Sequence, residues 1–233
     1  MSRRDDEKFQ QPVEMSPDLE MRPRDFSHKS VDLTESLRKF RDKLPSNLGK
    51  GRQEPQGSFA KVTMTLDPDT ANPNLILSAD RRSMRWGDAQ QDLPDNPERF
   101  DTCPCLLGCK EITSGRHYWE VEVEEKGNWA VGIATAFVKR KDWIHRNPEG
   151  GIWALEKWRN HLKALTIPET HLPLCQFPQR IRVSLDHQGG QVSFFDASND
   201  ALIFTFPQTS FTGQRLLPWF WLYGSKSELR ICP

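Results

Sequence analysis

The stretch at residues 114–123 constrains the fold of this chain more than any other. Its sequence, SGRHYWEVEV, opens with a glycine turn and continues with polar and apolar side chains in alternation. Successive side chains of a β-strand point to opposite faces of the sheet, so Trp119, Val121 and Val123 share one face and polar residues share the other. The stretch therefore predicts a strand with one face in a hydrophobic core.

Similar short runs recur from Phe59 to the carboxyl terminus, with turn residues between them. The sequence 187–190 (HQGG) between two such runs is expected to form a hairpin turn, because glycine adopts positive φ without a Cβ penalty. The pattern predicts an all-β domain. The predicted strands are 75–78, 119–124, 129–135, 151–155, 181–186, 191–196, 202–206 and 216–223.

Four sequence blocks together resemble one known family. They are LDP at 66–68, DNPERF at 95–100, the stretch at 114–123, and LRICP at 229–233. In this order and spacing they resemble the PRY-SPRY domain of tripartite-motif and butyrophilin proteins, over residues 59–233. The resemblance implies a distorted antiparallel β-sandwich, the SPRY form of a concanavalin-like jelly roll. It also implies binding of partners through loops at one end of the sandwich.

The composition argues against several other classes of protein. Lys plus Arg and Asp plus Glu number 32 each, so no net field attracts nucleic acid or anionic lipid. No apolar run is long enough to span a bilayer, and the first residues lack the apolar core of a secretory signal. Five cysteines, an odd number, favour reduced thiols over a disulfide framework. We therefore expect a cytoplasmic protein with no nucleic-acid or membrane partner.

Neither a metal site nor an active site is expected. Cys103 and Cys105 are followed by Cys109, but no second Cys or His pair at zinc-finger spacing would complete four ligands. We interpret these thiols as structural or idle. The sequence has no Gly-x-Ser-x-Gly or His-Glu-x-x-His motif and no phosphate-binding glycine loop. We expect no catalysis, no cofactor and no metal.

Residues 1–45 are charged and contain the one convincing helical period in the chain. Apolar residues recur there every seven positions, with two more offset by four, which is the a/d pattern of a coiled coil. The alternative is an amphipathic helix folded back on the domain. Residues 46–58 are expected to form a flexible linker. Weak self-association is expected through Leu19, Phe26, Leu33, Leu37, Phe40 and Leu44.

The eight tryptophans divide into two groups by their sequence context. Trp119, Trp129 and Trp153 fall in apolar strand runs, so we expect them in the core. Trp143 and Trp158 instead stand among charged residues. Large aromatic side chains in such places are typical anchors for a binding partner.

The family resemblance extends the predicted site to loops after residue 100 and at 139–147, 156–163 and 218–221. In such a site, aromatic rings supply contact area and charged groups set the register of the partner. The alternative for each residue is a solvated rim over apolar packing. The implied partner-binding residues are Asp101, Thr102, Trp143, His145, Lys157, Trp158, Trp219 and Phe220.

The resemblance implies recognition of a protein or peptide target, as the substrate-recognition part of a tripartite-motif E3 ubiquitin ligase in innate immune regulation. One alternative is a butyrophilin-like intracellular ligand sensor. Its basic pocket is poorly matched, because Cys103 and Ala130 align with two histidines of that subgroup and His145 aligns with a lysine. A second alternative is a RING-less decoy. These residues contain no RING zinc cluster, so the chain alone is not expected to transfer ubiquitin.

Overall fold

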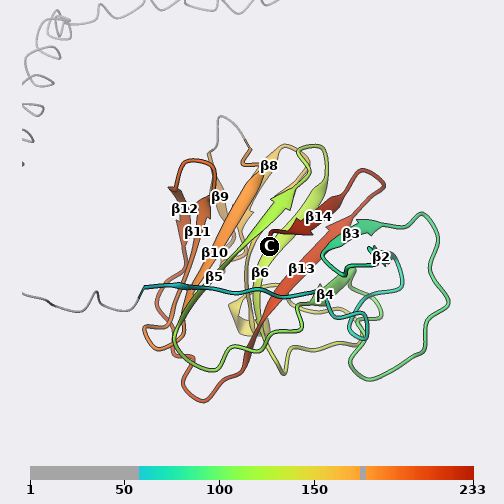
Figure 1. The fold of residues 1–233 in the computed structure, drawn as a ribbon, viewed down its shortest axis with the longest axis horizontal. Helices are drawn as coiled ribbons and strands as arrows, with labels where there is room; N and C mark the ends of the chain where they lie inside the picture. The colour runs from blue at the N-terminus through green and yellow to red at the C-terminus, as the bar shows by residue number, and fades with distance from the viewer. Residues whose placement is uncertain (1–57, 174–176) are drawn as a thin grey trace, which may run out of the picture. The chain divides into compact units, whose positions relative to one another are not determined.

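Two mainly antiparallel β-sheets pack into a sandwich, as a computed structural model of the chain shows (Figure 1). The structure describes residues 58–173 and 177–233. The all-β prediction is confirmed within these ranges. The predicted helix at 1–45, its apolar stripe and all but the last residue of the predicted linker lie outside the described residues. Among the described residues, no helix has the length and hydropathy that a membrane span requires.

The larger sheet has eight strands in the order β12-β11-β10-β5-β14-β3-β2, and β1 pairs in parallel with β5. On the central strand β5, Trp119, Val121 and Val123 are buried, as the alternation predicts. The predicted turn at 187–190 joins β10 to β11, and Gly190 has a φ of 65° there. The strands are β1 (Ala60–Lys61), β2 (Leu75–Leu77), β3 (Ser83–Trp86), β5 (Arg116–Val123), β10 (Arg180–Asp186), β11 (Gln191–Asp196), β12 (Ala201–Thr205) and β14 (Glu228–Ile231).

The smaller sheet has six strands in the order β4-β13-β6-β7-β8-β9. All eight predicted strands are present in the two sheets, with shifted ends in most cases. The sequence pattern missed β1, β3, β4, β8, β9 and β14, which are four residues long or shorter and owe their pairing to tertiary neighbours. The strands are β4 (Cys105–Leu107), β6 (Asn128–Thr135), β7 (Ile152–Trp158), β8 (His161–Ala164), β9 (Thr170–Leu172) and β13 (Leu216–Tyr223).

The main hydrophobic core contains the inward-facing residues of both sheets. Trp119 and Trp129 are fully buried in it, and Trp153 is nearly so. The ring of Trp153 meets Phe211 edge-on, with 5.0 Å between the ring centroids. The prediction that these three tryptophans fill the core is therefore confirmed.

A second buried cluster covers the opposite face of the six-stranded sheet. Small side chains, including Ala130 and Ala134 of β6 and Ala154 of β7, form the sheet side of this cluster. Loop residues such as Phe100 and Val138 pack onto them. Because the central strands carry small residues on this face, the loops lie close to the sheet. This second cluster positions the segments that surround the candidate site.

Candidate functional site

A cavity of about 600 Å³ is bounded by the six-stranded sheet and three neighbouring segments of the chain. Its volume falls in the range of pockets that hold a ligand or an anchoring side chain. We call it the aromatic pocket. The strands β7, β8 and β13 supply Glu156, Trp158, Lys163, Trp221 and Tyr223, and the surrounding segments supply Asn74, Trp86, Thr102, Pro104, Trp143 and Arg146.

Strand alternation explains which side chains reach this pocket. On β13, Trp221 and Tyr223 are two residues apart and therefore lie on the same face. The residues beside Trp221, Phe220 and Leu222, belong to the main core between the sheets. One strand thus contributes to the pocket and to the core at alternate positions.

Four aromatic rings contact one another along the pocket. Trp221 and Tyr223 stack with an interplanar angle of 10° and 6.2 Å between centroids. Trp158 lies 6.0 Å from Trp221 and 5.6 Å from Tyr223, and Trp86 lies 5.0 Å from Tyr223. Trp143, at the rim, is 76% exposed. The four rings form a continuous apolar surface, and the exposed side chain of Trp143 lies beside it.

A buried carboxylate organises the charged side of the pocket. Glu156 is only 2% exposed, and its carboxylate pairs with the Arg146 guanidinium and, at 3.1 Å, with Lys163 Nζ. Burying an unpaired carboxylate is costly, so two cations compensate for its desolvation. Lys163 also pairs with Glu169 at 2.9 Å. Desolvation opposes the charged lysine, but the hydrogen bonds to Glu169 and Glu156 leave the pKa of Lys163 raised.

The position of Arg146 depends on the short 3₁₀ helix η2 (Pro148–Gly150) that follows it. The side chain of Asn147 accepts a hydrogen bond of 3.0 Å from the backbone N–H of Gly150, which caps this turn. A Cβ atom at Gly150 would lie 1.9 Å from the carbonyl oxygen of His145. Only glycine therefore lets the chain close this tightly beside the pocket.

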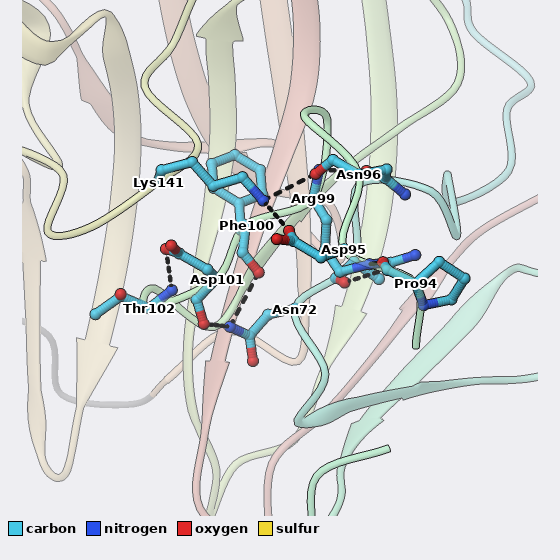
Figure 2. Close-up of polar contacts among 10 residues, drawn as sticks. Asn72, Pro94, Asp95, Asn96, Arg99, Phe100, Asp101, Thr102 and Lys141 are labelled. Carbon is cyan, nitrogen blue, oxygen red and sulfur yellow. Dashed lines mark hydrogen bonds and ion pairs between the residues drawn. The ribbon is translucent and has the colours of Figure 1, made fainter. Parts of the chain in front are cut away.

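Hydrogen bonds fix the wall formed by Thr102 (Figure 2). The side-chain amide of Asn72 donates to the carbonyl oxygens of Phe100, at 3.2 Å, and Asp101, at 2.7 Å. The Asp101 carboxylate accepts a hydrogen bond from the backbone N–H of Thr102. One carboxylate oxygen of Asp101 therefore already accepts a hydrogen bond within its own loop.

Two cations attach this wall to the rest of the domain, as Figure 2 also shows. Arg99 is 5% exposed, and its guanidinium donates to the carbonyl oxygens of Pro94, at 2.9 Å, and Ala71, at 2.6 Å. Lys141, from the loop after β6, pairs with Asp95 at 2.7 Å. The Arg99 bonds hold the loop before Thr102 to the domain, and the Lys141 pair joins that loop to the loop after β6. Both loops are therefore held beside the pocket before any partner binds.

The structure brings three of the eight predicted site residues to the pocket: Thr102, Trp143 and Trp158. Asp101 and His145 are exposed in the adjoining loops, but they do not line the cavity. Five of the eight predicted residues thus line or adjoin the cavity, and whether a partner binds there stays a prediction.

Lys157, Trp219 and Phe220 require a correction, because the structure buries all three. Lys157 Nζ donates to the carbonyl oxygens of Gly127, at 2.9 Å, and Arg159, at 2.8 Å. Trp219 lies in the second cluster, and Phe220 in the main core. The family alignment placed these residues in loops, whereas they lie within β7 and β13. Lys157 and Phe220 alternate with pocket residues and therefore lie on the opposite face of the sheet, whereas Trp219 shares the face of Trp221 and is buried there within the second cluster.

Sequence reasoning missed several residues that line the pocket. Two of them carry a usable signal: Glu156 lies two residues before Trp158, and Trp221 lies two residues after Trp219 on an aromatic strand. Trp86 and Tyr223 are outside the predicted site. The others show no pattern in the sequence. The missed residues are Asn74, Trp86, Pro104, Arg146, Glu156, Lys163, Trp221 and Tyr223.

Two family models match the chain. One, described as the SPRY-associated domain PRY, covers residues 64–112, and one described as the SPRY domain covers residues 116–233. Zinc finger protein RFP of Homo sapiens is 41% identical over 238 residues, which cover 100% of this chain and 46% of that protein. The chain thus spans less than half the length of this curated relative.

Further relatives match a shorter part of the chain. Butyrophilin subfamily 1 member A1 of Mus musculus is 47% identical, covering 74% of this chain and 33% of that protein. E3 ubiquitin-protein ligase TRIM11 of Bos taurus is 44% identical, covering 72% of this chain and 36% of that protein.

Two solved structures have a similar fold. The TRIM65 PSpry domain superposes with a TM-score of 0.64 at 23% identity and covers 74% of this chain and 90% of that chain. Stonustoxin superposes with a TM-score of 0.63 at 25% identity, over 74% of this chain and 29% of that chain. These likenesses concern the arrangement of the two sheets.

Proposed function

Because this chain belongs to the PRY-SPRY family of tripartite-motif and butyrophilin proteins, we propose that it recognises a protein target by accepting an apolar or aromatic side chain in the aromatic pocket. The observation that carries this proposal is the continuous surface of Trp86, Trp158, Trp221 and Tyr223 beside the exposed Trp143. Interface hot spots are enriched in such rings around a partly enclosed centre.

The charges in the pocket favour a protein segment over a phosphorylated metabolite. A phosphate site requires cationic donors that converge on the anion. Here Arg146 and Lys163 both already bind the carboxylate of Glu156, and Lys163 binds Glu169 as well. These four groups carry no net charge. The ligand-sensor alternative is therefore weaker than protein recognition.

The wider role that we propose is target selection for a tripartite-motif E3 ubiquitin ligase in innate immune regulation, in the cytoplasm. Support for the ligase comes from the similarity to a relative named as an E3 ubiquitin-protein ligase. In this role the chain binds the target and has no catalytic part. A RING-less decoy would use the same pocket to compete for the target, so the binding proposal holds for both.

Peptide selection on the full chain tests the pocket directly. We would select binders from a random peptide phage library and measure their affinities by titration calorimetry with two variants. Trp158→Ala removes a pocket ring and is expected to weaken binding at least about tenfold. The matched control is Phe137→Ala, because Phe137 is 79% exposed and lies outside the pocket lining. Selected peptides that bind Trp158→Ala as well as the wild type would contradict the proposal.

A further inference from the structure

Two cysteines adjoin each other at the wall of the pocket. The sulfur atoms of Cys103 and Cys105 are 3.0 Å apart, and the two residues are 1% and 0% exposed. The backbone N–H of Cys105 donates to the carbonyl oxygen of Cys103 at 2.7 Å. This hydrogen bond closes a γ-turn with Pro104 at its centre. The turn explains why residues separated by one proline bring their sulfurs together.

We propose that Cys103 and Cys105 form a site of reversible oxidation, at which a small hydroperoxide converts the two thiols into a disulfide. A disulfide holds its sulfurs about 2.05 Å apart, so the sulfurs need to approach by only about 1 Å. Their sequence spacing gave no reason to expect this, because a strand would place residues two apart on one face without bringing their sulfurs into contact.

The surroundings of the two thiols assign them different roles. The hydrogen bond between the two sulfurs, helped by the charge of Arg146, lowers the pKa of Cys103 despite burial. Burial raises the pKa of Cys105 well above its usual range. Cys103 is therefore the thiol that reacts first, because the thiolate is the nucleophile.

The reaction has two balanced steps. The Cys103 thiolate attacks one peroxide oxygen, the O–O bond breaks, and the departing oxide takes a proton to leave as water or an alcohol. Cys103 is then a sulfenic acid. The Cys105 sulfur attacks the Cys103 sulfur, the S–O bond breaks, and water leaves as the S–S bond forms. The two thiols lose two electrons in total, and the peroxide gains them.

The burial of both sulfur atoms limits the oxidant to a small molecule. Thr102 and Pro104, on either side of Cys103, line the aromatic pocket, so in this proposal a small hydroperoxide approaches the buried sulfurs from this cavity. A bulky disulfide such as oxidised glutathione cannot reach a sulfur atom that is so fully covered. The disulfide would also tighten the turn that carries Pro104, and so alter the pocket wall. Disulfide formation itself does not depend on the proposed partner.

The test uses the full chain with the variant Cys109→Ser. Trypsin leaves residues 100–110 as one peptide, which contains Cys103, Cys105 and Cys109, so this substitution leaves a single possible pair in it. We would treat the reduced folded protein with hydrogen peroxide, alkylate it under denaturing conditions, digest it and weigh the peptide. The expected product is lighter by two hydrogens, resists alkylation and is restored by dithiothreitol. Oxidised glutathione is expected to leave the peptide reduced.

The wild-type chain supplies an internal control, because its Cys109 is exposed and reports whether the peroxide has reacted. The proposal is overturned if Cys103 and Cys105 both remain open to alkylation at a peroxide dose that oxidises Cys109. It is also overturned if Cys103 proceeds to a sulfinic acid with no S–S bond. In the variant Cys105→Ser, dimedone added with the denaturant after the peroxide treatment should instead trap the sulfenic acid on Cys103. The main experiment does not need this variant to fold.

Discussion

The guanidinium of Arg146 lies 4.5 Å from the centroid of the Trp221 ring while it pairs with the buried carboxylate of Glu156. One side chain therefore links the aromatic part of the pocket to its charged part. Cation–π contact holds the ring, and the ion pair holds the cation. This arrangement preorganises the pocket, which lowers the cost of ordering side chains when a partner binds.

The first prediction concerns this link. Arg146→Gln should lower the free energy of unfolding by about 2 kcal/mol, because it removes one of the two cations that compensate for the buried Glu156. Urea unfolding measures the change. Combining it with Glu156→Gln should cost less than the sum of the two single changes, since the carboxylate that needs the cation is gone. Strict additivity of the two substitutions would show that the pair contributes nothing.

The second prediction separates pocket aromatics from core aromatics. Trp119→Ala should lower the free energy of unfolding by about 3–5 kcal/mol, because it empties a fully buried site in the main core. Trp158→Ala should cost about 1 kcal/mol, since that ring is partly exposed and borders a cavity. Both values come from urea unfolding followed by circular dichroism. If the two variants unfold at the same urea concentration, Trp158 is a structural residue.

The third prediction concerns the turn beside Arg146. Gly150→Ala should weaken binding of the selected peptides by about tenfold, because the added Cβ would collide with the backbone of His145 and shift Arg146. The control is Gly213→Ala: Gly213 has a φ of 72°, but nothing lies within 4 Å of the added atom. This control should cost about 1 kcal/mol of stability and leave affinity unchanged. Equal affinities for both variants would argue against the collision.

The fourth prediction is a pH dependence at the end of β10. Burial opposes ionisation of Asp186, but hydrogen bonds from the Gly189 N–H, at 2.7 Å, and from Arg116, at 2.7 Å, outweigh it and lower the pKa of the carboxyl. A folded-state pKa below the unfolded value of about 3.9 stabilises the fold above that pH, and the stabilisation disappears as the pH falls through the folded value.

Asp186→Asn should therefore lower the free energy of unfolding by about 1 kcal/mol at pH 7, and this difference should shrink as the pH falls below about 4. Chemical denaturation at several pH values measures it. The control Asp88→Asn alters an exposed carboxylate and should leave the free energy of unfolding at pH 7 nearly unchanged. A difference for Asp186→Asn that stays constant between pH 7 and pH 3 would contradict the assignment.

The sequence allowed correct prediction where one side of a strand is buried and the other is not. Trp119, Val121 and Val123 alternate with polar residues, so the pattern identified both the strand and its core face. On β13 almost every side chain is apolar, because both faces are covered. The alternation of polar and apolar residues is then lost, so the sequence does not show which of Phe220 and Trp221 faces the main core. The structure shows that Phe220 does and that Trp221 faces the pocket.

Other parts of the site depend on contacts that no local pattern records. Arg146 and Glu156 meet because a loop folds over β7, and Trp86 reaches the pocket from the other sheet. The pair of Cys103 and Cys105 depends on a turn whose geometry is set by its hydrogen bond. Such features require the tertiary fold, so the sequence indicated the neighbourhood of the site but not its composition.

The alternation along β13 also bears on how relatives of this domain diverge. A substitution at Trp221 that altered target choice would disturb a strand whose preceding residue, Phe220, packs in the main core. Trp143 stands on a loop and is 76% exposed, so we expect its substitution to have little effect on folding. New target preferences should therefore arise through the loop at Trp143 more readily than through β13. Related domains would then acquire new partners while keeping the pocket residues of β13 unchanged.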